Sequence, residues 1–95
     1  MKISVITVAY NSQYTIRDTI NSVVGQTYKN IEHIIIDGGS NDGTKKIVNN
    51  YKNKNNKVFH KPGLGIYEAI NFGIKNASGK FISILNSDDF YSSPD

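Results

Sequence analysis

Apolar residues in this chain gather in short continuous runs, and polar segments separate the runs. Ile3–Ala9 and Ile31–Ile36 are rich in β-branched residues, a composition typical of strands that are covered on both faces. Phe81–Leu85, introduced by Gly79, predicts a further buried strand, and Val58–His60 predicts a shorter one. The pattern therefore predicts strands spread over the whole chain.

Between these runs, apolar residues recur three and four positions apart, which is the spacing of one helical face. The first helix is predicted to start at the N-cap residues Asn11 and Ser12 and to end near Gly25. A second follows the glycine-rich turn 37–44, and a third is predicted to stop at Gly79. The apolar positions of the three helices are Ile16, Ile20, Val23 and Val24; Ile47, Val48 and Tyr51; and Ile66, Ala69, Ile70, Gly73, Ile74 and Ala77.

Strands that alternate with amphipathic helices over short connections predict an α/β fold. We expect a Rossmann-like parallel sheet with flanking helices and right-handed crossovers. In such a sheet the carboxyl ends of the strands share one rim, and ligands bind there. The residues that follow each strand are therefore the first candidates for function.

The composition limits the class of protein without identifying its function. With 95 residues, 38% of them hydrophobic, the chain is expected to be one small globular domain. It has no cysteine, and no apolar run approaches the roughly 20 residues that span a bilayer. Because no signal sequence is recognisable, we expect a cytoplasmic protein, with attachment to the inner face of the membrane left open.

The net charge of +3 has its origin in one segment. Lys45–Lys61 contains six lysines and no acidic residue, and its asparagines are typical of a solvated helix end and loop. A non-enzymatic module that binds a polyanion through this segment is an alternative function. Nucleic acid is not the expected partner, because aromatic and arginine residues do not alternate with the lysines.

Polar residues at the strand ends are candidates for a ligand site. Tyr10 follows the first strand, where its ring either stacks on a flat ligand or lies half-buried with its hydroxyl in water. Asp37 follows the second strand and either accepts a hydrogen bond from a base N–H or bonds its own turn. Asp88 and Asp89 follow the last strand, and they either hold a divalent cation or belong to a polar loop.

Two glycine clusters resemble phosphate-binding motifs without matching them. The turn 38–43 lacks the Gly-Lys-Ser/Thr ending of a P-loop, and the segment 63–65 lacks the third glycine of a dinucleotide fingerprint. Gly63 and Gly65 nevertheless lead into a predicted helix N-terminus, where backbone N–H groups can meet an anion. His33 and His60 have no partner at metal-ligand spacing and are interpreted as structural.

Five short motifs together resemble those of the family 2 glycosyltransferases. They cover residues 4–11, 22–28, 36–44, 65–73 and 85–89, and their order and spacing carry the resemblance. The motif at 65–69 is most similar to bacterial members that assemble exopolysaccharide, capsule or lipopolysaccharide glycans. The resemblance implies a GT-A fold and an inverting transfer of sugar from a UDP- or GDP-sugar to a glycan or lipid-linked acceptor.

The same resemblance implies roles for individual residues. Tyr10 would stack on the base, Asp37 would bond its N–H edge, and Asp88 and Asp89 would coordinate Mn²⁺ or Mg²⁺ on the diphosphate. The metal would neutralise charge that develops on the leaving group. The nucleotide-sugar site implied in this way consists of Val8, Ala9, Tyr10, Asp37, Gly65, Asn71, Ser87 and Asp88.

By this resemblance, residues 1–95 form the nucleotide-sugar-binding part of a larger domain. The acceptor site and the general base would lie C-terminal of Asp95, so we expect no catalytic residue and no efficient transfer in this segment alone. Ser92–Asp95 also resembles the start of a helix, which predicts a longer polypeptide. Without later strands, Phe81–Leu85 would be an exposed sheet edge through which copies of the chain associate.

Two residues depart from the common family pattern. Asn86 stands where many members have the first aspartate of the metal motif, which predicts weaker metal binding. Ile70 stands where many members have an arginine, so any contact of that arginine with phosphate or sugar would be absent.

Overall fold

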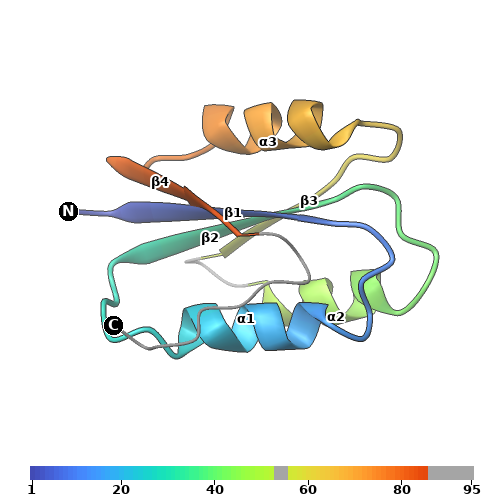
Figure 1. The fold of residues 1–95 in the computed structure, drawn as a ribbon, viewed down its shortest axis with the longest axis horizontal. Helices are drawn as coiled ribbons and strands as arrows, with labels where there is room; N and C mark the ends of the chain where they lie inside the picture. Colours follow the sequence, from blue (N-terminus) through green and yellow to red (C-terminus); the bar gives the residue numbers. More distant parts are fainter. Residues whose placement is uncertain (53–55, 86–95) are drawn as a thin grey trace.

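A parallel four-stranded sheet with helices on both faces is the framework of the molecule (Figure 1). The computed structural model describes residues 1–52 and 56–85. The strand order is β3-β2-β1-β4, and each neighbouring pair is parallel, so the predicted fold class is confirmed. The elements are β1 (Ile3–Ala9), α1 (Ile16–Val24), β2 (Ile31–Asp37), α2 (Thr44–Tyr51), β3 (Asn56–His60), α3 (Ile66–Lys75) and β4 (Phe81–Ile84).

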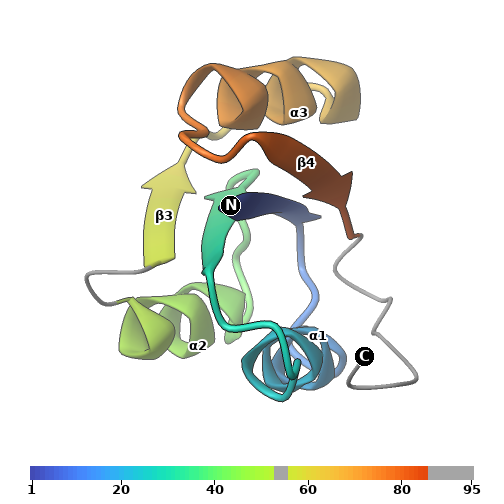
Figure 2. The same cartoon turned by 90° about the vertical axis from the view of Figure 1, so that its left-hand side faces the viewer.

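The helices form two layers around the sheet, with α1 and α2 on one face and α3 on the other (Figure 2). β1 and β2 are the central strands and are covered on both faces, which explains their continuous apolar runs. The core between the sheet and helices α1 and α2 contains Ala9, Ile16, Ile20, Ile35 and Val48. The core between the sheet and α3 contains Ile6, Ile34, Ile36 and Ala69.

Gly73 allows α3 to approach the sheet closely. A Cβ atom at this position would lie 2.7 Å from Ile6 Cγ2 and 3.0 Å from Ile36 Cδ1. Both distances are shorter than the roughly 3.5–4.0 Å at which carbon atoms pack favourably. The predicted stripe of α3 therefore includes a glycine because the helix backbone itself forms part of the interface.

The prediction of a buried final strand is wrong for β4. Phe81, Ile82 and Ile84 are 52%, 43% and 49% exposed. Among the described residues the strand pairs only with β1, so it lies at an edge of the sheet, where fewer neighbours cover it. Leu85, directly after the strand, is buried against Val23 and other core residues. The exposed sheet edge expected from the family resemblance is therefore present among the described residues, whereas association of copies through it stays a prediction.

The start of the first helix also differs from the prediction. α1 begins at Ile16, because the carbonyl of Ser12 accepts hydrogen bonds from the N–H groups of Thr15 and Ile16 in a preceding turn. Asn11 adopts φ 48°, a left-handed conformation that asparagine tolerates better than most residues. Neither Asn11 nor Ser12 is therefore the N-cap.

The third helix ends earlier than predicted. α3 stops at Lys75, and Ile74 in its last turn is 40% exposed, so the apolar stripe does not continue to Gly79. Gly79 instead lies against β1, where an added Cβ would be 2.6 Å from the backbone nitrogen of Ser4. The glycine marks a close crossing of two backbone segments, which its spacing in the sequence did not indicate.

His33 is fully buried in β2, as expected of a structural histidine. Its Nε2 atom lies 2.8 Å from Thr7 Oγ1, and its Nδ1 atom lies 3.2 Å from the Tyr51 hydroxyl. Burial lowers the pKa of His33 to about 3 and raises the pKa of Tyr51 to about 12. Both side chains are therefore neutral at physiological pH, and they link β1, β2 and α2 inside the core.

Candidate functional site

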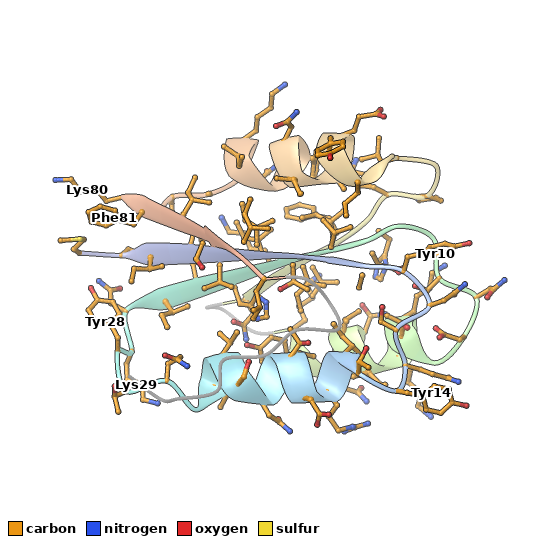
Figure 3. The ribbon with its side chains drawn as sticks, in the orientation of Figure 1. Tyr10, Tyr14, Tyr28, Lys29, Lys80 and Phe81 are labelled. Atoms are coloured by element: carbon orange, nitrogen blue, oxygen red, sulfur yellow. The ribbon has the colours of Figure 1, made fainter. Side chains whose placement is uncertain are left out.

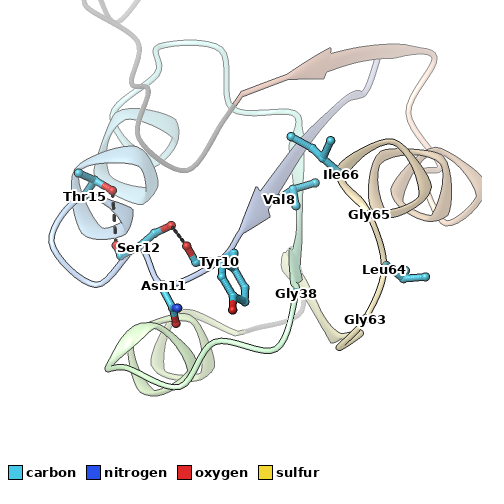
Figure 4. A pocket seen from close by; sticks show the side chains of 10 residues that line it. All are labelled: Val8, Tyr10, Asn11, Ser12, Thr15, Gly38, Gly63, Leu64, Gly65 and Ile66. Carbon is cyan, nitrogen blue, oxygen red and sulfur yellow. Dashed lines mark hydrogen bonds between the residues drawn. The ribbon is translucent and has the colours of Figure 1, made fainter.

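A cavity opens at the carboxyl ends of the central strands, beside the N-terminus of α3 (Figure 4). Its volume of ≈ 890 Å³ lies within the range of about 300–1,000 Å³ that is usual for small-molecule sites. We call it the rim pocket. The residues that line it are Val8, Tyr10, Asn11, Ser12, Thr15, Gly38, Gly63, Leu64, Gly65 and Ile66.

Tyr10 and Gly38 form one side of the rim pocket. The Tyr10 side chain is 61% exposed, and a Cβ atom on Gly38 would lie 3.7 Å from Tyr10 Cδ1. Gly38, which lies next to the ring in the close view, has no side chain that could cover it (Figure 4). An exposed aromatic face of this kind offers a surface on which a flat ring can stack.

The segment before α3 forms the other side of the pocket. Gly63 has φ +88°, a conformation that favours glycine, and Gly65 is the N-cap of α3 without a side-chain cap hydrogen bond. The first turn of a helix carries N–H groups that have no partner within the helix, and the helix dipole is positive there. This side of the pocket is therefore suited to an anion such as a phosphate.

Hydrogen bonds join the loop after β1 to the glycine-rich turn after β2. The Asn11 N–H donates to Ser40 Oγ over 2.8 Å, and the Asn41 N–H donates to Asn11 Oδ1 over 2.9 Å. Each loop thus donates one hydrogen bond to the other. They hold Asn11 in its left-handed conformation and thereby fix the position of the neighbouring Tyr10.

The same two loops are joined again next to the first turns of α1 and α2. The Ser12 N–H donates to Thr44 Oγ1 over 2.7 Å, and the Gly43 N–H donates to Gln13 Oε1 over 2.8 Å. Asp42 accepts hydrogen bonds from the N–H groups of Thr44 and Gln13. Desolvation acts to raise the pKa of Asp42, but the hydrogen bonds outweigh it and hold the pKa below its usual value. The polar residues of this turn thus stabilise a pocket wall.

Asp37 is fully buried at the end of β2 and does not line the rim pocket. Its Oδ1 atom accepts hydrogen bonds from the Ser40 N–H over 3.2 Å and from Ser40 Oγ over 2.5 Å. Its Oδ2 atom lies 3.1 Å from His60 Nδ1. Asp37 thus bonds its own turn through Oδ1, as one of its two interpretations expects, and a hydrogen bond from a base N–H stays a prediction.

The contact between Asp37 and His60 could not be anticipated from the sequence. The two residues are paired in the register of β2 and β3, and the Lys61 N–H donates to the Asp37 carbonyl over 2.8 Å. His60 Nε2 also lies 3.0 Å from Asn49 Oδ1 on α2. The only signal in the sequence was a histidine at the end of a strand, because the register that brings it to Asp37 is a tertiary property.

The structure brings together part of the predicted nucleotide-sugar site. Val8, Tyr10 and Gly65 line the rim pocket, whereas Ala9 is fully buried in the core between α1 and the sheet. Asn71 is exposed on α3 and is not among the lining residues. Lining residues that the sequence did not single out as ligand contacts include Ser12, Thr15, Leu64 and Ile66.

The predicted metal-binding residues cannot be placed in this site. Ser87, Asp88 and Asp89, together with Asn86, lie outside the described residues. Within residues 1–52 and 56–85, no group of three or more His, Cys, Asp or Glu side chains is arranged to hold a metal ion. In the same part of the chain, no helix has the length and hydrophobicity required to cross a membrane.

Residues 4–95 match the sequence family described as Glycosyl transferase family 2. The chain is 42% identical over 95 residues to the Escherichia coli protein named UDP-Glc:alpha-D-GlcNAc-diphosphoundecaprenol beta-1,3-glucosyltransferase WfaP. That similarity covers 94% of this chain and 36% of WfaP. The chain thus spans about a third of the length of WfaP, and it spans 13% of the length of a Rickettsia bellii glycosyltransferase to which it is 43% identical.

Solved structures show the same arrangement of strands and helices. Staphylococcus aureus TarS 1–349 in complex with UDP-GlcNAc is similar with a TM-score of 0.86 and 36% sequence identity, over 95% of this chain and 27% of TarS. The mannosyltransferase PcManGT from Pyrobaculum calidifontis, in complex with GDP-Man and Mn²⁺, gives a TM-score of 0.91 over 99% of this chain and 29% of that protein. At 22% identity, the second likeness supports the fold alone.

Proposed function

Since its match extends over residues 4–95, this chain belongs to the family 2 glycosyltransferases, and we propose that the rim pocket binds the nucleotide of a nucleotide-diphosphate sugar. The observation that carries the proposal is the presence of the exposed Tyr10 ring and the α3 N-terminus in one cavity. An aromatic face suits a base, and a helix N-terminus suits a phosphate. A nucleoside diphosphate contains both groups.

The proposed contacts follow the layout of the pocket. Tyr10, which lines the pocket, stacks on the base, and Val8 borders it. The contacts of the Ala9 backbone with the base, and of Asp37 with the N–H edge of the base, are proposed on the family resemblance, because neither residue lines the pocket. Gly65 and the first turn of α3 face the phosphates. Contacts from Asn71 and Ser87 are proposed on the family resemblance alone.

A UDP-sugar is the donor that the comparisons favour. TarS, at 36% identity, was solved with UDP-GlcNAc, and the name of WfaP specifies UDP-Glc and a lipid-linked acceptor. We expect the same classes of donor and acceptor here, with a GDP-sugar as the second candidate. A cytoplasmic location at the inner face of the membrane would suit a lipid-linked acceptor.

The proposed reaction is an inverting glycosyl transfer. An acceptor hydroxyl attacks the anomeric carbon from the face opposite the diphosphate, a general base takes the hydroxyl proton, and the bond to the nucleotide diphosphate breaks. The base and the acceptor site are expected C-terminal of Asp95, with residues 1–95 as the donor-binding part. Asp88 and Asp89 are the proposed ligands of Mn²⁺ or Mg²⁺, which would neutralise charge on the departing diphosphate.

Calorimetric titration with UDP and GDP, with and without Mn²⁺, tests this proposal. Tyr14 provides a matched control for Tyr10, because it is 88% exposed near the same end of the molecule and does not line the pocket (Figure 3). Stacking of a base on an aromatic ring is worth about 1–3 kcal/mol, so Tyr10→Ala should weaken UDP binding roughly 5- to 150-fold. Tyr14→Ala should bind like the wild type.

Two outcomes would contradict the proposal. Equal affinities of the Tyr10→Ala and Tyr14→Ala proteins would exclude stacking on Tyr10. Asp88→Ala should remove the dependence of UDP binding on Mn²⁺, and an unchanged dependence would exclude Asp88 as a metal ligand.

The alternative of a polyanion-binding module gains no support from the lysine segment. Lys57 pairs with Glu32 over 3.2 Å, and Lys61 Nζ lies 4.6 Å from the centre of the Phe72 ring. Two of the lysines are thus engaged within the fold. Binding to anionic vesicles that depends steeply on salt and is unchanged in Tyr10→Ala would support the polyanion-binding module.

A further inference from the structure

The buried state of Asp37 raises a question about how a nucleobase reaches it. The proposed function assigns Asp37 to the N–H edge of the base, yet its side chain is 0% exposed and lies outside the pocket lining. A base that bonds this carboxylate must therefore replace a group that covers it. Among the described residues, the side chains that bond the carboxylate are those of Ser40 and His60.

Ser40 is poorly suited to move away from Asp37. It is 3% exposed, it donates two hydrogen bonds to Oδ1, and its own Oγ accepts the N–H of Asn11. Displacing Ser40 would break the connection that fixes the loop of Tyr10. The hydrogen bonds to Oδ1 are therefore part of the structure that holds the pocket wall.

His60 covers the other oxygen and is held much more loosely. Its side chain is 36% exposed, and it lies at the end of β3, an edge strand of the described sheet. Beyond Asp37, its ring contacts the side chain of Asn49, which is itself exposed. Because the ring is partly exposed and has one further contact in the described part of the chain, with an exposed side chain, few interactions oppose its rotation away from Asp37.

The His60 ring presents to Asp37 the same group that a base would present. A carboxylate offers only acceptors, so the Nδ1 atom that faces Oδ2 over 3.1 Å carries a proton. A ring N–H bound to Asp37 Oδ2 occupies the same acceptor that the imide N–H of uracil would need. Resting on the proposed function, we propose that His60 is an internal substitute for the nucleobase, which the base displaces from Asp37 when the nucleotide binds.

This role makes His60 a determinant of affinity and of base selectivity. A base that bonds Asp37 must replace an existing hydrogen bond, whereas a base without a ring N–H gains nothing at Asp37 and leaves His60 in place. Removing the imidazole leaves Asp37 open to the base. A hydrogen bond contributes a net of about 0.5–1.5 kcal/mol, so His60→Ala should bind UDP roughly 2- to 10-fold more tightly than the wild type. A residue that merely orients Asp37 would produce the opposite change.

The first experiment is calorimetric titration of the full chain with UDP and with UDP methylated at the imide nitrogen. The gain in affinity of His60→Ala is expected for UDP and not for the methylated nucleotide, because only UDP donates to Asp37. His60→Asn keeps an N–H donor close to the Nδ1 position and should bind UDP less tightly than His60→Ala. Asp37→Asn should lose the difference between the two nucleotides.

The second experiment uses the unmodified protein and does not depend on the folding of a variant. The chain contains two histidines, so ¹⁵N-labelled histidine gives two sets of ring signals in an NMR spectrum. UDP should shift the His60 ring signals, whereas those of His33, buried against Thr7 and Tyr51, should stay in place. The methylated nucleotide should leave both sets unchanged.

The outcomes separate this proposal from the proposed function. If the wild type binds UDP and Tyr10→Ala binds it more weakly, the proposed function stands, and weaker binding by His60→Ala or an unmoved His60 signal overturns the displacement of His60 alone. If the wild type binds neither UDP nor GDP, both proposals are overturned. Tighter binding by His60→Ala together with a shifted His60 signal supports the displacement.

Discussion

Replacing Glu32 with glutamine is predicted to remove a pH-dependent part of the folding free energy. Glu32 lies in β2 with its side chain 7% exposed. Its Oε1 atom accepts hydrogen bonds from Ser4 Oγ over 2.8 Å and from the Ser78 N–H over 2.9 Å. Its Oε2 atom accepts one from Ser78 Oγ over 3.1 Å and pairs with Lys57 Nζ over 3.2 Å. These contacts join three strands and the connection before β4.

The magnitude follows from the pKa of this carboxyl group. Burial alone would raise the pKa of Glu32, but hydrogen bonds from Ser78, Ser4 and Lys57 outweigh burial and lower it from 4.5 to about 2. One pKa unit corresponds to about 1.36 kcal/mol, so ionised Glu32 stabilises the fold by about 3 kcal/mol. Because the folded pKa is below the unfolded one, this contribution is present above pH 4.5 and is lost as the pH falls toward 2.

Urea unfolding of the wild type and Glu32→Gln at a series of pH values measures this contribution. Glutamine has nearly the same volume and does not titrate, so the difference in free energy of unfolding isolates the charge. We expect a difference of about 3 kcal/mol at neutral pH that closes near pH 2. Other titrating groups change in both proteins and cancel in the comparison.

A difference that stays constant over this pH range would refute the reasoning, because it would mean that packing and not ionisation distinguishes the two proteins. Lys57→Met is the matched control. The lysine side chain is 45% exposed, and an ion pair at such a position contributes less than about 1 kcal/mol. Most of the effect should therefore remain when only Lys57 is replaced.

Two further predictions concern the core. His33 has a pKa of about 3 in the folded state and 6.5 in the unfolded state, so it gains its proton at a much lower pH when the protein is folded. As the pH falls from 6.5 to 3, the free energy of unfolding of the wild type should therefore decrease by about 1.4 kcal/mol per pH unit because of His33. Urea unfolding of His33→Gln provides the comparison, and an equally steep decrease in this variant would contradict the prediction. Gly73→Ala should destabilise by about 1–3 kcal/mol through overpacking against Ile6, despite a helix-propensity gain of about 1 kcal/mol. A higher melting temperature of Gly73→Ala would show that α3 can move away from the sheet.

Much of the fold could be predicted because its signals are local. The β-branched run Ile3–Ala9 has the bounds of β1, and the stripe of Ile16, Ile20 and Val23 marks the buried face of α1. Tyr10 could be expected at a cavity because residues at the carboxyl ends of parallel strands meet at one rim, and Gly65 could be expected there from the family resemblance. Their role in binding a ligand stays a prediction. Apart from the placement of Gly65, these inferences need only the periodicity of a segment and the class of the sheet.

Contacts between distant segments could not be predicted in the same way. Phe81 and Ile82 have the composition of a buried strand, and the edge position that leaves them exposed was expected only from the family resemblance, not from their own pattern. Gly79 has the spacing of a helix end, but its role is to admit the backbone of Ser4. In each case the surroundings come from another part of the chain, and no local pattern records them.

The sequence by itself determined the α/β class, the family and the rim at which Tyr10 lies. Only the tertiary structure decided how this rim is held, since the turn that carries Ser40 bonds the loop of Asn11 across 29 residues. It also decided the state of Asp37, because the register of β2 and β3 places His60 against its carboxylate. The physical reason is that strand order and register determine which polar groups are buried together, whereas periodicity determines only which residues turn inward.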